Sequence, residues 1–277
     1  MMRTTDRSPL RYPGGKTKAI TQLQDWVPAF TEYREPFLGG GSMAINVAKH
    51  MPGKSVWVND LYVPLYNFWI QLRDNAEELS ERLFKLKTDL NKQTEECRKV
   101  FNQFANEIDD ATGVDQAVMF WMMNKCSYSG LTQNSSFSPT ASNSNFSLRG
   151  TEMLLEYSKL IQNWKITNVD YSELLQTPGQ DVFVFLDPPY DIKDFLYGKD
   201  REMHRNFDHH VFADHVDGCL HKFMITYNVN DWLEERYKNY YQRYWKLQYG
   251  MVHRQNNKKT ELLVTNYNCG SPLEALI

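Results

Sequence analysis

The chain has 277 residues, of which 42% are hydrophobic and 14% are aromatic, and its formal net charge is −3. This composition excludes an intrinsically disordered protein, and the length suits one large domain or a domain with a sizeable insertion. The sequence has no apolar run near the roughly 20 residues of a membrane span and no apolar signal-peptide core at its start. It therefore predicts a soluble cytoplasmic protein with no membrane partner.

The first part of the chain predicts alternating helices and strands. Residues 10–24 predict a Pro-Gly-Gly turn followed by a helix, and residues 33–48 predict a strand, a glycine turn and a helix. Residues 56–58 predict a short strand that ends at Asn59 and Asp60. This alternation is typical of an α/β fold.

A helical segment then interrupts the alternation. Between Leu65 and Leu90 apolar residues recur at steps of three and four, which predicts one face of a long amphipathic helix. Residues 114–123 also have a helical pattern. Residues 126–148 carry no charge and are rich in Ser, Asn and Thr, which predicts a long polar loop. We therefore expect residues 67–150 to form a mainly helical insertion.

The α/β alternation resumes after the insertion. Residues 151–162 predict a helix with Thr151 as its N-cap, and Asp208 is placed to cap a helix that runs to about Leu220. Residues 191–207 predict a charged loop in the position of a lid. Strands are expected at 165–169, 182–186, 223–227 and 261–265. The expected core thus combines residues 1–66 with residues 151–268, followed by a tail at 269–277.

A glycine turn and an acid indicate a nucleotide-type cofactor. Gly39, Gly41 and Ala44 fit the pattern G-x-G-x-x-G/A, and Asp60 follows 19 residues after Gly41. In this pattern the backbone approaches the cofactor and the carboxylate binds ribose hydroxyls. NAD would suit the helix behind the turn, but the segment TEYREPF is too polar for the usual buried first strand. S-adenosylmethionine and a plain strand–helix turn are the other interpretations.

The motif Asp187-Pro188-Pro189-Tyr190 ends a strongly apolar strand. Proline has no N–H for a sheet, so the strand stops at the edge where α/β proteins bind ligands. The exocyclic amine of a nucleobase is a poor nucleophile because its lone pair is delocalised. The Asp187 carboxylate and the Pro188 carbonyl would accept its two N–H groups and localise that pair for methyl transfer. Tyr190 offers a ring on which a flipped-out base can stack. A solvent-exposed turn is the bland alternative.

Cysteine and metal chemistry have weaker support. The four cysteines have no CxxC spacing and lie away from both motifs, whereas methylation at a ring carbon needs a thiolate. A metal site is conceivable at a group of acids and histidines, but these residues fit a solvated helix face equally well, so no metal is expected. The group comprises Asp208, His209, His210, Asp214 and His215.

Together these residues resemble the Dam-type DNA adenine N6-methyltransferases, the alpha group of the D12 class. The motifs also follow that group's order. They are RYPGGK at 11–16, EPFLGGGS at 35–42, Asn59-Asp60, NKCSYSGL at 124–131, DPPY at 187–190 and KKTELLVTNY at 258–267. The resemblance implies a Rossmann-like, S-adenosylmethionine-dependent methyltransferase fold. Such a fold has a seven-stranded mixed sheet with helices on both faces, and here a helical target-recognition insertion.

The resemblance also implies the site residues. The catalytic residues are expected to be Asp187, Pro188, Pro189 and Tyr190. Cofactor contacts are expected at Tyr12, Lys16, Glu35, Phe37, Gly39, Gly41, Ser42, Asp60, Asp170, Tyr171 and Asp187. DNA contacts are expected at Arg11, Asn124, Tyr128, Gln133, Asn134, Arg149, Lys258 and Lys259.

The implied reaction is methyl transfer from S-adenosylmethionine to the N6 amine of an adenine flipped out of double-stranded DNA, leaving S-adenosylhomocysteine. Members that read GATC usually carry an arginine near the position of Gln133, so the target sequence is left open. The resemblance suggests a bacterial or phage-encoded, nucleoid-associated enzyme, with a companion restriction endonuclease as a conceivable partner. The alternatives are methylation of RNA or of cytosine N4, a non-catalytic DNA-binding regulator, and a nucleotide-dependent oxidoreductase.

Overall fold

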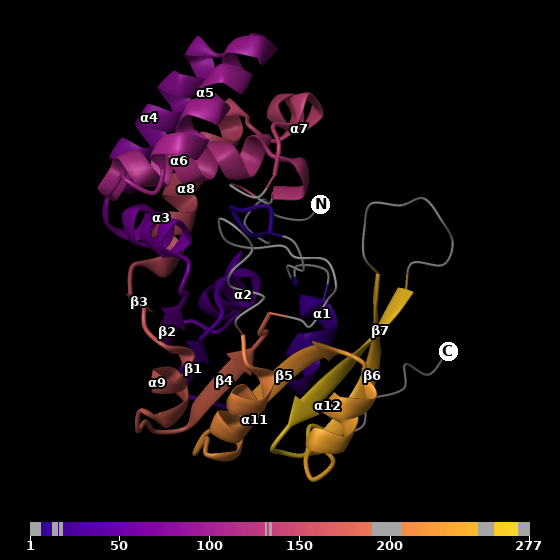
Figure 1. Ribbon diagram of the computed structural model, residues 1–277. Helices are drawn as coiled ribbons and strands as arrows, with labels where there is room; N and C mark the ends of the chain where they lie inside the picture. Colours follow the sequence, from indigo (N-terminus) through magenta and orange to yellow (C-terminus); the bar gives the residue numbers. More distant parts are fainter. Residues whose placement is uncertain are drawn as a thin grey trace, which may run out of the picture.

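The computed structural model describes residues 7–12, 16, 19–130, 132, 135–189, 207–248 and 258–270. Within these residues the centre of the molecule is a seven-stranded sheet with strand order β3-β2-β1-β4-β5-β7-β6 (Figure 1). Neighbours from β3 to β5 run parallel, and β7 runs antiparallel to β5 and β6. The strands are β1 (Glu32–Glu35), β2 (Ser55–Asn59), β3 (Trp164–Thr167), β4 (Val182–Leu186), β5 (Lys222–Asn228), β6 (Tyr241–Gln248) and β7 (Lys258–Thr265). The predicted α/β fold with a mixed sheet is confirmed.

The helices lie on both faces of the sheet and beyond one of its ends (Figure 1). Along β4, Phe183 and Phe185 join one core with residues of α2, α3 and α8, whereas Val184 and Leu186 join a second core with Phe212 of α11. This division follows from the two-residue period of a strand. The helices are α1 (Ile20–Leu23), η3 (Gln24–Trp26), α2 (Ser42–His50), α3 (Val63–Asp74), α4 (Ala76–Asp89), α5 (Thr94–Glu107), α6 (Gly113–Cys126), η4 (Tyr128–Gly130), α7 (Pro139–Ser144), α8 (Leu148–Ile161), α9 (Tyr171–Gln176), α11 (His209–Asp217) and α12 (Asp231–Arg236).

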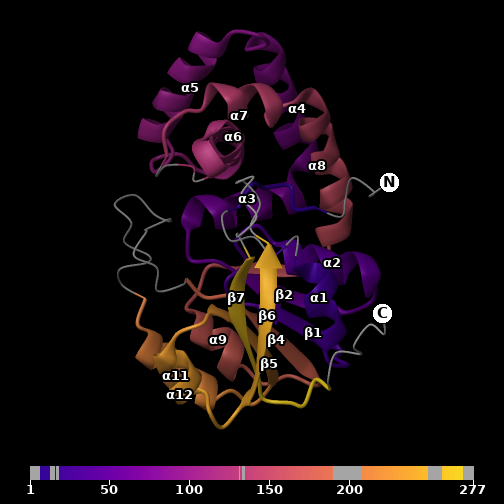
Figure 2. The same ribbon diagram turned by 90° about the vertical axis from the view of Figure 1, so that its right-hand side faces the viewer.

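Helices α3 to α8 form a helical body at one end of the sheet, which both views place at the top (Figures 1 and 2). Tyr62, which follows β2, packs against Phe120 of α6 with ring centroids 6.0 Å apart. The helical body therefore stands over the carboxyl ends of the parallel strands. No helix in the described part of the chain is both long enough and apolar enough to span a membrane.

Strand β1 is buried although its sequence is polar, so the expectation that TEYREPF is too polar for a buried first strand was wrong. Tyr33, Arg34 and Glu35 are at most 3% exposed, and β1 pairs with β2 on one side and β4 on the other. The Arg34 guanidinium donates to Glu32 Oε1 at 2.6 Å and to the Leu174 carbonyl at 2.8 Å. Polar side chains are tolerated here because they have hydrogen-bond partners.

Two predictions about the insertion were wrong. The long helix expected between Leu65 and Leu90 is two helices, α3 and α4, separated at Asn75, whose φ of −134° and ψ of 36° are not helical. The polar stretch expected to be a loop contains η4 and α7, because Ser138 accepts a hydrogen bond from the Ala141 N–H and caps α7. The expected insertion boundaries at 67 and 150 fall inside α3 and α8.

Helix caps in the second half were partly predicted. Asp208 caps α11 as expected, accepting from the His210 and Val211 N–H groups, but the helix ends at Asp217. Helix α8 begins at Leu148 with Ser147 as its N-cap, so the expected cap at Thr151 was wrong. Strand β6 and helices α9 and α12 were not predicted. The expected lid at 191–207 lies outside the described residues apart from its final residue.

Candidate active site

Asp187 is the first residue after β4, and its carboxylate contacts the side chains of Lys16 and Thr226. Its Oδ1 atom lies 2.9 Å from Lys16 Nζ and accepts a hydrogen bond of 2.8 Å from Thr226 Oγ1 of β5. Lys16 is 3% exposed, while Asp187 keeps 22% of its side chain exposed. The buried cation and the hydroxyl fix the orientation of a carboxylate that solvent can still reach. Pro188 is buried beside it, and Tyr190 lies outside the described residues.

The glycine turn between β1 and α2 needs glycine for two reasons. Gly39 and Gly41 have φ values of +49° and +66°, in the left-handed region that side chains disfavour. A Cβ atom at Gly39 would lie 2.7 Å from the ring of Tyr12, and one at Gly41 would lie 2.7 Å from the ring of Trp69. The turn is thus packed tightly from both sides, and Trp69 also donates its indole N–H to the Gly39 carbonyl at 3.2 Å.

Asp60 accepts backbone hydrogen bonds from the glycine turn and from the start of the segment that follows β2. Its Oδ2 accepts from the Gly39 N–H at 2.8 Å, and its Oδ1 accepts from the Tyr62 N–H at 3.0 Å. Burial raises the pKa of Asp60 to about 6. The glycine turn and this acid therefore lie together at the carboxyl ends of β1 and β2, and their contact with a cofactor stays a prediction.

Glu35 is a buried acid beneath the same edge. It ends β1, is 3% exposed, and its Oε2 accepts from the Tyr33 hydroxyl at 2.7 Å. Burial raises its pKa to about 8, and the nearby charges of Asp187 and Asp60 act in the same direction. A cationic group beside these carboxylates would favour their charged forms, which is the chemistry that a sulfonium cofactor presents.

Aromatic side chains close one side of this region. Phe37 packs against Tyr171 with ring centroids 5.4 Å apart and against Phe207 with centroids 5.7 Å apart. The Tyr171 hydroxyl lies 2.9 Å from His215 Nδ1. Asp170 caps α9 by accepting from the Ser172 N–H at 2.9 Å. Phe37 and Tyr171, which are far apart in sequence, are thus neighbours at the ends of β1 and β3.

The carboxylates, the glycine turn and the aromatic cluster meet at one edge of the sheet. The family model of the D12 class N6 adenine-specific DNA methyltransferases matches residues 12–259. The chain belongs to this family. The predicted family and the predicted enzyme class, an adenine-specific DNA methyltransferase, are confirmed. Methyltransferases of this family use S-adenosylmethionine and act on DNA.

Relatives of this D12-class methyltransferase occur in archaea, bacteria and viruses. The Type II methyltransferase M.MjaIII of Methanocaldococcus jannaschii is 27% identical over 196 residues, covering 65% of this chain and 68% of that protein. A DNA adenine methylase of Escherichia coli is 22% identical over 203 residues, covering 67% of this chain and 65% of that protein. The Type II methyltransferase M.CviBI of a Paramecium bursaria Chlorella virus is 23% identical over 276 residues, covering 93% and 98%. The match spans about two thirds of the first two proteins and nearly all of the third.

The expected DNA-contacting residues of this D12-class methyltransferase lie in different surroundings. Tyr128 of η4 is 64% exposed, and Arg149 of α8 is also exposed. Arg11 Nη1 donates to the Ser127 carbonyl at 2.9 Å. Asn124 is fully buried, and its side-chain amide bonds to backbone atoms, so the expectation of a DNA contact there was wrong for this structure. Of the other four, Gln133 and Asn134 lie outside the described residues, and the backbones of Lys258 and Lys259 begin β7.

The acids and histidines weighed as a metal site have other partners in the D12-class methyltransferase. His209 Nδ1 lies 3.1 Å from the Tyr227 hydroxyl, and Asp214 is 3.0 Å from Arg236. Among the residues that the structure describes, no three His, Cys, Asp or Glu side chains form a group that could hold a metal ion.

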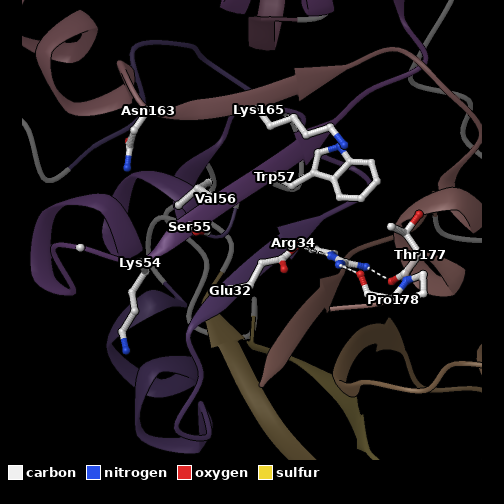
Figure 3. Close-up of a pocket in the computed structure, with 11 residues that line it drawn as sticks. Glu32, Arg34, Lys54, Ser55, Val56, Trp57, Asn163, Lys165, Thr177 and Pro178 are labelled. Carbon is white, nitrogen blue, oxygen red and sulfur yellow. Dashed lines mark hydrogen bonds and ion pairs between the residues drawn. The ribbon is translucent and has the colours of Figure 1, made fainter. Parts of the chain in front are cut away.

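A cavity of about 470 Å³ lies at the opposite end of the sheet (Figure 3). Its lining includes Glu32 and Ser55, which begin β1 and β2, together with Lys54 and Lys165. Figure 3 shows the Arg34 side chain pointing toward Thr177 and Pro178, whose carbonyls it binds at 2.6 and 3.2 Å. This cavity is therefore separate from the carboxyl-end site and is organised around a fold-stabilising arginine.

Sequence reasoning missed two side chains that organise the methyltransferase site. Thr226 binds Asp187, and Trp69 holds the glycine turn from α3. Each acts across 30 or more residues of sequence, and neither belongs to a recognisable motif. The available signal was a single polar residue in the apolar run Phe223 to Tyr227.

Proposed function

We propose that this chain transfers the methyl group of S-adenosylmethionine to the N6 amine of an adenine flipped out of double-stranded DNA. The observation that carries the proposal is the placement of Asp187 directly after β4, oriented by Lys16 and Thr226. The glycine turn and Asp60 stand at the same edge of the sheet. A fixed carboxylate next to a cofactor turn is what methylation of an amine requires.

The side chains at this edge fit the proposed cofactor by their chemistry. Asp60 suits the ribose hydroxyls, and Phe37 and Tyr171 offer apolar faces for an adenine ring. The acids Glu35 and Asp187 suit a positive sulfonium. Bound S-adenosylmethionine would supply the electrophilic methyl group. The other proposed contacts are Tyr12, Lys16, Gly39, Gly41, Ser42 and Asp170.

The protein's part in the reaction is to prepare the target amine. We propose that the Asp187 carboxylate accepts one N–H of that amine and the Pro188 carbonyl accepts the other. The nitrogen lone pair would then be localised to form a bond to the methyl carbon as the bond from that carbon to sulfur breaks. S-adenosylhomocysteine would be the leaving group, and one amine proton would pass to solvent. Pro188 is fixed by its ring and by burial, so the carbonyl needs little reorganisation. Pro189 stiffens the same turn, and Tyr190 is proposed as the stacking ring.

Target recognition is assigned, in this proposal, to the insertion at residues 67–150. The exposed ring of Tyr128 can stack on a base, and the exposed Arg149 can contact phosphate. Arg11, Gln133, Asn134, Lys258 and Lys259 complete the proposed DNA surface. Two of the three relatives described above carry the name Type II methyltransferase, which supports a companion restriction endonuclease as a proposed partner. A cytoplasmic, nucleoid-associated location in a bacterium or phage-infected cell follows from a DNA substrate and stays a prediction.

The test is methyl transfer from labelled S-adenosylmethionine to unmethylated DNA, with RNA in parallel, followed by nucleoside mass spectrometry. N6-methyladenine from DNA is the expected product, and it should be lost in Asp187→Ala. N4-methylcytosine or label in RNA would replace the adenine assignment. Tight cofactor binding with no transfer to either polymer would point to a DNA-binding regulator instead.

A further inference from the structure

Residues 7–12, which we call the N-terminal strap, run between the helical body and the glycine turn (Figure 1). On the helical side the strap is held by Asn124, in the last turn of α6. Asn124 Oδ1 accepts from the Arg11 N–H at 2.9 Å, and its Nδ2 donates to the Arg11 carbonyl at 2.7 Å. The same Nδ2 donates to the Gly130 carbonyl at 3.0 Å. One fully buried amide therefore joins the strap to η4.

The strap and η4 also meet at backbone distance. Gly130 has a φ of +78°, and a Cβ atom there would lie 2.1 Å from the Arg11 carbonyl oxygen. Arg11 itself donates from Nη1 to the Ser127 carbonyl at 2.9 Å, and Lys125 Nζ donates to the Pro9 carbonyl at 2.5 Å. Residues 124–130 thus contact the strap through side chains and main chain, directly beside the exposed ring of Tyr128.

The other side of the strap packs on the cofactor turn. The ring of Tyr12 fills the space that a Cβ atom at Gly39 would need. A Cβ atom at Gly40 would likewise lie only 2.8 Å from the Cβ atom of Tyr12. The Ser8 hydroxyl donates to the Gly40 carbonyl. Gly39 in turn binds Asp60. A short, continuous path of packed groups therefore leads from η4 through Arg11 and Tyr12 to the turn.

We propose that Asn124 is a positioning residue that couples target recognition to cofactor binding. The proposal rests on the proposed function, because it assigns DNA to η4 and the cofactor to the glycine turn. A duplex that contacts η4 shifts Gly130 and Asn124, and the hydrogen bonds of the Asn124 amide shift the backbone of Arg11. The neighbouring Tyr12 ring then moves, which changes how tightly it packs on the glycine turn. Because linkage is reciprocal, DNA should tighten cofactor binding by the same factor by which cofactor tightens DNA binding.

The helix that carries Asn124 offers a matched control. Gln116 is a second buried amide of α6, but its Nε2 donates to the Ile108 carbonyl at 2.9 Å, inside the helical body. Asn124→Ala and Gln116→Ala both remove a buried amide from one helix. Only Asn124→Ala removes a contact to the strap. A difference between the two variants therefore measures the effect of that contact and not the effect of lost packing.

The experiment measures S-adenosylhomocysteine binding by calorimetry, with and without an unmethylated duplex that the wild type methylates. In the wild type and in Gln116→Ala, the duplex should raise the affinity for S-adenosylhomocysteine by a factor of about five or more, since about five is the lower end of typical coupling factors. In Asn124→Ala this factor should fall to about one. If Asn124→Ala does not fold, Asn124→Asp can replace it. Aspartate has nearly the same volume, but an acceptor oxygen then stands where the amide nitrogen donates to the Arg11 and Gly130 carbonyls.

Two results overturn the proposal: a wild type without coupling, or an Asn124 variant that keeps the wild-type factor. Equal loss of coupling in Gln116→Ala would also overturn it, because the effect would then belong to the helical body as a whole. Methyl transfer by the wild type is measured separately. Methyl transfer without coupling between DNA and cofactor binding would contradict this inference alone. Coupled binding of DNA and S-adenosylhomocysteine without methyl transfer would instead count against the proposed catalytic function.

Discussion

Lys16 Nζ lies 2.9 Å from Asp187 Oδ1, and the lysine is almost completely buried. The pair joins a residue of the N-terminal motif to the acid after β4, across most of the sequence. Lys16→Gln should lower kcat by about 100-fold, because a displaced carboxylate no longer meets the target amine correctly. Steady-state methyl transfer measures this. The control is Lys54→Gln at the far end of the sheet, where Nζ binds the Phe30 carbonyl, and its kcat should stay at the wild-type value.

Thr226 offers a milder test of the same carboxylate. Thr226→Val keeps the shape of the side chain but removes the hydroxyl that donates to Asp187 Oδ1, so kcat should fall about tenfold. Asp187→Ala should abolish transfer while leaving the circular dichroism spectrum unchanged. The control for Thr226→Val is Thr265→Val, since the hydroxyl of this buried threonine donates to the Tyr267 carbonyl and not to Asp187. Equal kcat values for the two valine variants would contradict the role of Thr226.

Gly39 should tolerate no side chain. Gly39→Ala places a Cβ atom 2.7 Å from the Tyr12 ring at a φ of +49°, so unfolding free energy should fall by more than the ~1–2 kcal/mol of left-handed strain alone. Gly53→Ala isolates that strain, because its φ is +84° and its added Cβ would have no atom within 4 Å. Urea unfolding compares the two variants. Equal losses would show that Tyr12 moves aside freely.

Glu35 gives the fold a pH dependence of defined sign. Its pKa rises from an ordinary 4.5 to about 8 by burial, so the folded form holds the proton more tightly than the unfolded chain. Stability from this group is therefore complete below about pH 4.5 and is lost as pH rises through about 8. The slope is at most ~1.4 kcal/mol per pH unit. Glu35→Gln should flatten the curve of unfolding free energy against pH, whereas Glu152→Gln, at an exposed position of α8, should not.

Tyr128 should matter for DNA and not for the fold. Its ring is 64% exposed, so Tyr128→Ala should leave unfolding free energy within about 0.5 kcal/mol of the wild type. Loss of a stacked base should weaken DNA binding by about 1–3 kcal/mol. Fluorescence anisotropy with a labelled duplex measures the second effect. A destabilised variant with unchanged DNA affinity would place this tyrosine in the fold instead.

The parts of the site that the sequence predicted are local in the chain. Gly39 and Gly41 stand beside each other in a turn, Asp187 directly follows its strand, and Asp208 caps the helix that begins next to it. Such features depend on a few residues that are neighbours in the chain, so the sequence alone contains the information that predicts them. Asp60 and Gly39 could be expected at the same edge because each follows one of two parallel strands that lie side by side.

What could not be predicted depends on distant partners. Asn124 looked like a polar residue of a recognition loop, but its amide meets Arg11, 113 residues away. The polar strand β1 looked unsuited to a core because the carbonyls that bind Arg34 come 140 residues later. The break at Asn75 was hidden because the buried apolar residues keep a spacing of three and four through it, from Leu72 of α3 to Ala76 and Leu79 of α4. In each case tertiary contacts outweighed the local pattern.

The long separation between Arg34 and its partners also bears on how the chain folds as it is made. Strand β1 leaves the ribosome early, yet its neighbour β4 and the Leu174 and Thr177 carbonyls follow only after the whole helical body. Until then the Arg34 guanidinium can meet Glu32 and the Trp57 ring but not the carbonyls that bind it in the folded protein. Pairing over such distances slows folding and leaves strand edges open. The nascent chain should therefore depend on chaperones most strongly just before β4 is complete.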